Sequence, residues 1–219
     1  MSSAKEEILA RVRSAIADIP AGSVEERAPI DWEYARGMEI DGDLVNVFAE
    51  RVEDYRAVVV RCGENEIEDK IGEAVKHHNA SSLLIPPGLE DSWSAAAEGA
   101  GTRLVTEEDG QLSAKELNVV DGVLTASAVG IADTGTIVLD HGAGQGRRAL
   151  SLVPDLHICV VRADQVVTNV PQAIARLGDA VRAGQPLTWI SGPSATSDIE
   201  LSRVEGVHGP RTLHVIIAG

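Results

Sequence analysis

Short apolar runs alternate with helical patterns from Asp43 onward, and this alternation constrains the fold more than any other feature of the sequence. Helical spacing of apolar residues predicts helices at 43–52, 65–78, 91–99 and 170–182. Apolar runs predict strands at 57–60, 82–85, 102–106, 122–125, 136–140, 156–161, 187–191 and 212–217. Because continuous apolar strands between helices are typical of a sheet buried on both faces, we expect an α/β domain with a mostly parallel sheet.

The first part of the chain differs from this pattern. Residues 4–18 carry Ile8, Leu9, Val12 and Ile16 at helical spacing, whereas residues 19–42 are rich in charges, proline and glycine. We therefore expect an N-terminal helix and linker arm over residues 1–42 and one α/β domain over residues 43–219. Because a lone helix of this length is marginally stable in water, its apolar face should dock on a partner subunit or on the chain's own body.

The composition argues against nucleic-acid binding. The 219 residues carry a formal net charge of −15, and residues 1–110 hold 24 acidic and 11 basic side chains against 10 and 8 in the rest. Such a surface repels phosphate backbones, and aromatic residues, at 3%, are too few to stack on single strands. The acidic half either keeps the protein soluble or docks to a basic partner.

The cysteine count and the sequence motifs limit the metal and cofactor sites that the chain can form. Two cysteines, Cys62 and Cys159, cannot by themselves ligate an iron–sulfur cluster or a four-cysteine zinc site. The sequence has no HxH or HxxxH spacing, and we predict no metal site. It also lacks the dinucleotide and P-loop glycine motifs, so the cofactor stays unassigned.

No apolar run approaches the roughly 20 residues of a membrane span, and the first residues do not have the pattern of a secretory signal, so we expect a cytoplasmic protein.

The segment 190–200 is the first candidate site. It follows the predicted strand at 187–191, so we expect it at the carboxyl edge of the sheet, where α/β proteins bind ligands. Gly192 begins a turn, and the hydroxyls of Ser194 and Thr196 together with loop amides suit an anionic group. Alternatively, the segment only caps a helix, because Ser197 and Glu200 have the spacing of a capping box.

A histidine near the C-terminus is the second candidate. His208 has Gly209 after it and Gly206 two residues before it, so its ring is sterically open. Next to Asp198 or Glu200 it would form a carboxylate–histidine pair that can transfer a proton. The alternative is a histidine that only bonds backbone carbonyls in a tight turn.

Two further loops could contact a ligand. Thr134 and Gly135 form a sharp turn before the strand at 136–140, either as a structural turn or as a substrate contact. Three alternating glycines at 142, 144 and 146 then precede Arg147, which could bind an anionic ligand. A plain flexible connection is the alternative for this second loop.

Four motifs, in this order, resemble the LUD domain: Ile131–Thr136, Ser151–Pro154, Gly192–Glu200 and Val207–Pro210. The resemblance covers about 121–217 closely, covers the region from 43 only in pattern, and leaves out residues 1–42. It implies a three-layer, Rossmann-like fold related to ribose-5-phosphate isomerase, glucosamine-6-phosphate deaminase, CoA transferases and 5-formyltetrahydrofolate cyclo-ligase. It also implies a role in oxidising L-lactate to pyruvate together with iron–sulfur partner proteins.

Three hypotheses follow, and whether the chain is itself an enzyme stays open. In the first, an accessory subunit binds a small anion through Ser194, Thr196 and Arg147, with Asp198, Glu200 and His208 as the acid–base set. In the second, a self-sufficient transferase, isomerase or ligase acts on a phosphosugar, CoA ester or folate, with Glu200 or Asp198 as nucleophile or base. In the third, the motifs only shape turns. The first two need Thr196 and His208 to converge on one hollow.

Overall fold

The computed structural model describes residues 4–18, 42–107, 110–196, 204–205 and 209–219. The chain divides into two compact units, Met1–Tyr34 and Ala35–Gly219. In the first unit, helix α1 (Ala4–Ala15) has no buried residue in its described range, and Ile8, Leu9 and Val12 are exposed. Every strand among the described residues belongs to the second unit.

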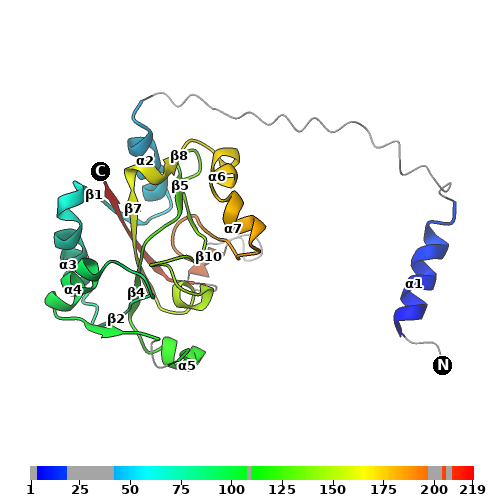
Figure 1. The fold of residues 1–219 in the computed structure, drawn as a ribbon, viewed down its shortest axis with the longest axis horizontal. Helices are drawn as coiled ribbons and strands as arrows, with labels where there is room; N and C mark the ends of the chain where they lie inside the picture. The colour runs from blue at the N-terminus through cyan, green and yellow to red at the C-terminus, as the bar shows by residue number, and fades with distance from the viewer. Residues whose placement is uncertain (1–3, 19–41, 108–109, 197–203, 206–208) are drawn as a thin grey trace. The chain divides into compact units, whose positions relative to one another are not determined.

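A six-stranded parallel sheet forms the centre of the second unit (Figure 1). Its strand order is β1-β12-β7-β4-β2-β3, and every neighbouring pair is parallel. The strands are β1 (Val58–Cys62), β2 (Ser82–Leu84), β3 (Arg103–Val105), β4 (Gly122–Thr125), β7 (Leu156–Arg162) and β12 (Thr212–Ala218). The predicted α/β class with a mostly parallel sheet is therefore confirmed.

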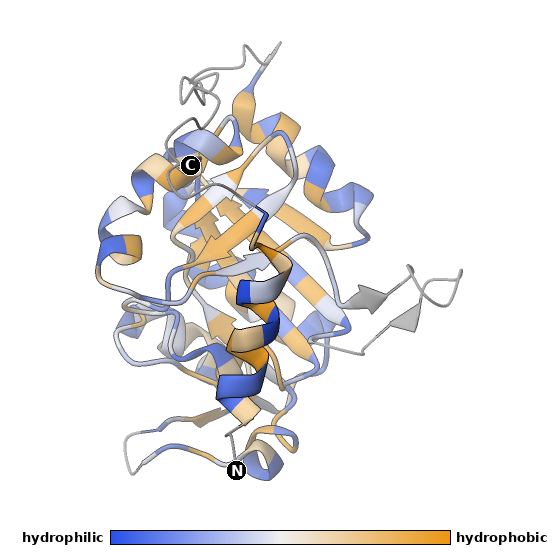
Figure 2. Ribbon diagram, turned by 90° about the vertical axis from the view of Figure 1, so that its right-hand side faces the viewer, coloured by the Kyte–Doolittle hydropathy of each residue, from blue (hydrophilic) through white to orange (hydrophobic). Residues whose placement is uncertain are grey.

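Helices α3 (Ile67–His77) and α4 (Asp91–Gly99) cover one face of this sheet. Their apolar sides, which include Ile71 and Trp93, pack on Ile158 and Ile216 of the two central strands. The alternate residues of those strands, such as Cys159 and Val215, face the other way and pack on helix α2 (Leu44–Asp54). Figure 2 shows the strands as mostly hydrophobic and the helices as mixed, as expected for a sheet covered on both faces.

A second, four-stranded sheet lies on the α2 side, in the order β8-β5-β6-β9. Its strands are β5 (Val129–Ile131), β6 (Thr136–Leu139), β8 (Val166–Val167) and β9 (Thr188–Ile190). Strand β6 pairs antiparallel with both β5 and β9, and β8 pairs parallel with β5. Helices α6 (Val170–Arg176) and α7 (Gly178–Arg182) follow β8, and Ala173 and Leu177 pack with Val138 on the outer face.

The sequence interpretation was wrong about two of these strands. Residues 136–140 and 187–191 were assigned to the parallel sheet, but they form β6 and β9 of the second sheet. Strand β6 is buried along its whole length because it lies between the central sheet and the outer helices. Its apolar run therefore looks like that of a central parallel strand. The single helix predicted at 170–182 is also divided, at Leu177.

Local features agree with the sequence at the start of the domain. The carboxylate of Asp43 accepts a hydrogen bond of 3.1 Å from the N–H of Val45, as expected for a helix N-cap. Phe48, the chain's only phenylalanine, is fully buried, and a Cβ on Gly130 would lie 3.0 Å from its ring. Burial of this ring contributes about 2–3 kcal/mol and holds α2 on the second sheet.

The remaining elements are short. They are η2 (Glu64–Glu66), α5 (Ala114–Leu117), η3 (Arg148–Ser151), η4 (Ala163–Gln165), β10 (Ala195–Thr196) and β11 (Val204–Glu205). Within the described ranges, no helix has both the length and the hydropathy that a membrane crossing requires.

Candidate functional site

A cavity of about 100 Å³ lies where three of the motif segments meet. Its walls come from the starts of β7 and β12 with the residues just before them, and from β9 and the turn after it. The lining residues are Ser151, Leu152, His157, Thr188, Trp189, Ile190, Gly192, Pro193, Ser194, Gly209, Pro210 and Leu213. We call this cavity the motif pocket.

The motif pocket does not lie at the carboxyl edge of the central sheet, where the sequence placed it. His157 and Leu213 are the second residues of β7 and β12, so the pocket opens near the amino ends of these strands. The expectation failed because Gly192 follows β9, which belongs to the second sheet and not to the central parallel sheet.

Two motif segments touch directly at the pocket. The backbone N–H of Ser194 donates a hydrogen bond of 2.8 Å to the carbonyl oxygen of Pro210. Beyond Ser194 the backbone pairs antiparallel between β10 and β11, with Thr196 opposite Val204. The structure therefore brings the segments around 194 and 210 together. The predicted acid–base residues Asp198, Glu200 and His208 lie outside the described residues.

His157 is the titratable group in the described lining of the motif pocket. Its ring is buried, and its Nε2 lies 2.7 Å from the hydroxyl oxygen of Thr125, its only hydrogen-bond partner in the described part of the chain. Burial lowers the pKa of His157 to about 4. The imidazole is therefore neutral near pH 7 and can form hydrogen bonds but supplies no positive charge. A histidine in the otherwise apolar strand at 156–161 was the signal that sequence reasoning missed.

Thr134 and Gly135 lie in the turn between β5 and β6, outside the lining of the motif pocket. A chain of hydroxyls connects this turn to the segment leading into the pocket: Thr134 to Thr136 at 2.8 Å, and Thr136 to Ser191 at 2.8 Å. Gly135 has φ +58°, and a Cβ there would lie 2.6 Å from the carbonyl carbon of Arg51 in α2. These contacts give the turn a packing role.

Gly192 is held against the same helix end. Its φ is +86°, and a Cβ at this position would collide with the Cβ of Tyr55, the residue that caps α2. Because only glycine tolerates both this backbone conformation and this contact, the turn at Gly192 fixes where Ser194 enters the pocket.

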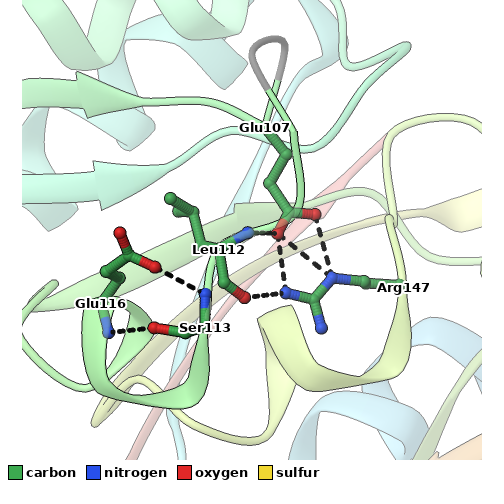
Figure 3. A network of polar contacts seen from close by, with 5 residues as sticks. All are labelled: Glu107, Leu112, Ser113, Glu116 and Arg147. Atoms are coloured by element: carbon green, nitrogen blue, oxygen red, sulfur yellow. Dashed lines mark hydrogen bonds and ion pairs between the residues drawn. The ribbon is translucent and has the colours of Figure 1, made fainter.

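Arg147 lies elsewhere, beyond the carboxyl end of β3. Its guanidinium forms an ion pair with Glu107, with nitrogen–oxygen distances of 2.7–3.1 Å, and donates to the carbonyl of Leu112 at 2.7 Å (Figure 3). The hydrogen bond from Arg147 lowers the pKa of Glu107. Arg147 and Ser194 therefore belong to different cavities, since Arg147 does not line the motif pocket.

The motif pocket can bind a small molecule through hydrogen bonds. Its described lining offers serine and threonine hydroxyls, backbone amides and a neutral imidazole, but no cationic side chain. Across the described ranges, no three His, Cys, Asp or Glu side chains gather in a way that could hold a metal ion. Its volume suits a molecule of a few heavy atoms, far below the roughly 300 Å³ at which most small-molecule sites begin.

Known proteins resemble this chain over most of its length, in sequence and in structure. Residues 45–218 match the model of the LUD domain. The chain is 44% identical to lactate utilization protein C of Deinococcus radiodurans, over 99% of this chain and 96% of that protein. It is 29% identical to lactate utilization protein C 1 of Bacillus mycoides, over 85% and 83% of the two chains. A crystal structure of a DUF162 family protein from Deinococcus radiodurans superposes with a TM-score of 0.68 at 40% identity, covering 80% of this chain and 96% of that one.

Proposed function

Since the chain belongs to the LUD domain family, we propose that it is an accessory, ligand-binding subunit in the oxidation of L-lactate to pyruvate, acting with iron–sulfur partner proteins. One observation carries the proposal. A 44% identical relative named for lactate utilization aligns with 99% of the chain, and a 29% identical one aligns with 85% of it. The structure adds a physical basis, because three of the four motif segments meet around one small pocket.

The redox part of the reaction belongs to partners in this proposal. Oxidation of L-lactate to pyruvate releases two electrons and two protons, and the electrons need an acceptor. The chain has only two cysteines, fewer than the four thiolates that ligate most iron–sulfur clusters. Burial also raises the pKa of the Cys159 thiol to about 12, so this residue stays protonated and packs as an apolar group.

The role of this chain is to hold a small carboxylate. The volume of the motif pocket, about 100 Å³, matches a three-carbon hydroxy acid and not a nucleotide or CoA ester. The Ser194 hydroxyl would contribute a contact to the carboxylate, and neutral His157 would contribute a hydrogen bond. Asp198, Glu200 and His208 are proposed as the groups that move a proton.

Deletion of the gene tests this proposal. The deletion strain should fail to grow on L-lactate as sole carbon source, grow normally on pyruvate, and recover when the wild-type chain is supplied. Growth on pyruvate isolates the oxidation step, because pyruvate enters metabolism after it. Normal growth of the deletion strain on L-lactate would contradict the proposal. Turnover of a phosphosugar, CoA ester or folate by the purified chain would instead support the self-sufficient enzyme.

A further inference from the structure

The central sheet has a topological switch point between β2 and β4. These strands are parallel neighbours, but the chain leaves them in opposite directions. From β2 it continues outward to β3, and from β4 it returns, by way of the second sheet, to β7 on the other side. Ligands of open α/β sheets bind in the crevice outside the carboxyl ends of the strands at such a point.

The glycine-rich loop at 140–147 crosses this switch point. The carbonyl oxygen of Gly144 accepts from the N–H of Ala126, after β4, and its own N–H donates to Pro87, after β2, both at 2.9 Å. A Cβ on Gly146 would lie 2.7 Å from Leu150 and 3.0 Å from Pro86. The loop is therefore fixed between the two strand ends, and the flexible connection that the sequence allowed is not what forms here.

The conformation of this loop is strained and held from inside. His141 has φ +60°, which is rare for a residue other than glycine. Its ring bridges the carbonyl of Gly146 and the hydroxyl of Thr188, both at 2.8 Å. The side chain of buried Gln145 accepts hydrogen bonds from the N–H groups of Asp140 and His141. Strained residues that are held in this way concentrate at ligand-binding sites.

A basin of about 540 Å³ opens over the loop, and this volume lies in the usual range of small-molecule sites. Its walls include Pro87 after β2, Glu107 after β3, His141 of the loop, and Arg147 and Arg148 at the loop's end. We call this cavity the switch-point basin. It shares no lining residue with the motif pocket.

Two arginines give the basin donors for an anion. Glu107 and Leu112 engage Nε and Nη2 of Arg147, which leaves Nη1 without a hydrogen-bond partner among the described residues (Figure 3). Arg148 is exposed and has no ion-pair partner in the described ranges. Because Glu107 holds the first guanidinium in place, the N–H groups of Nη1 are already oriented, which lowers the entropic cost of binding an oxyanion.

We propose that the switch-point basin binds a small molecule carrying a phosphate or carboxylate group, with Arg148 and Nη1 of Arg147 as the anion contacts. This site is separate from the motif pocket and does not depend on the function proposed for that pocket. The loop backbone would lie along the body of the ligand, and the fixed loop would keep the basin open before binding.

Titration calorimetry of the full chain at low ionic strength tests this inference, with pyrophosphate and citrate as separate probes. We expect saturable 1:1 binding of at least one probe, and the tighter probe identifies the anionic group. Arg148→Gln should weaken that binding at least about tenfold, since a charged hydrogen bond is lost. A control variant should bind as the parent does: Arg182→Gln, which removes an exposed arginine of α7.

A second readout does not depend on the variants. In amide NMR spectra of the parent chain, the probe should shift the resonances of Gly142 and Gly146 more than that of Gly184, which lies outside the basin. Three results would overturn the inference: no saturable binding of either probe, equal weakening in Arg148→Gln and Arg182→Gln, or shifts that spare the loop.

Discussion

The backbone N–H of Ser194 and the carbonyl oxygen of Pro210 lie 2.8 Å apart and join the turn after β9 to the segment that leads into β12. Gly209 lies beside this bond: its φ of +149° favours glycine, and a Cβ there would be in ordinary van der Waals contact with that of Ser194, at 3.6 Å. Ser194, Pro210 and His157 all line the motif pocket. The pocket therefore depends on contact between segments of both sheets.

Gly135→Ala should destabilise the domain more than Gly184→Ala. Both glycines have a positive φ, +58° and +71°, so each substitution costs about 1–2 kcal/mol in backbone strain. At Gly135 the new Cβ also meets the backbone of Arg51, whereas nothing lies within 4 Å at Gly184. We expect an additional loss of about 1–3 kcal/mol for Gly135→Ala in urea unfolding. Equal losses for the two variants would show that the turn does not pack on α2 as described.

Stability should fall as the pH drops from about 6.5 toward 4. Burial lowers the pKa of His157 to about 4, and burial together with His78 lowers that of His214 to about 4, from an ordinary value of 6.5. The unfolded chain then binds these protons at higher pH than the folded chain. The stabilisation that these two neutral histidines contribute is fully present above about pH 6.5 and is lost as the pH falls from 6.5 to 4.

His157→Gln isolates one of these protons. The slope of the unfolding free energy against pH between 4 and 6.5 should decrease by up to about 1.4 kcal/mol per pH unit. Thr125→Ser keeps the imidazole and a hydroxyl partner and should retain the parent slope. An unchanged slope in His157→Gln would mean that this ring is not buried in its neutral form.

The ion pair between Glu107 and Arg147 should show measurable coupling. In a double-mutant cycle with Glu107→Gln and Arg147→Gln, we expect a coupling free energy of about 0.5–2 kcal/mol, because the Glu107 side chain is only 10% exposed. The same cycle on Asp179 and Arg182, which are 98% and 75% exposed, should give a coupling near zero. Similar values for both pairs would contradict a rigid guanidinium in the switch-point basin.

Most of the central sheet could be predicted from the sequence because its strands are short, fully apolar and separated by helical patterns. The prediction at 122–125 agrees with β4 residue for residue, and helix 91–99 agrees with α4. Strand direction could not be predicted in the same way. The apolar run at β6 indicates a strand that is buried on two sides, but it does not indicate that this strand pairs antiparallel with β9.

The candidate site was predictable only in part, for the same reason. The sequence grouped Arg147 with Ser194 because both looked like anion contacts on loops after strands. The structure separates them, since one loop follows β6 of the second sheet and crosses to the ends of β2 and β4, while the other approaches β12. Partners such as Glu107 for Arg147 come from distant segments, and one sequence contains no signal for that pairing.

Growth on L-lactate with single-hydroxyl variants tests the central proposal most directly. Ser194→Ala removes a hydroxyl from the motif pocket, and the matched control Ser94→Ala removes one from α4, outside that pocket. In the deletion strain, Ser194→Ala should lower the growth rate on L-lactate at least about twofold and leave growth on pyruvate unchanged, while Ser94→Ala restores both. Full growth on L-lactate with Ser194→Ala would contradict a ligand role for this hydroxyl. If that variant had also lost stability, these motifs would be determinants of turns alone.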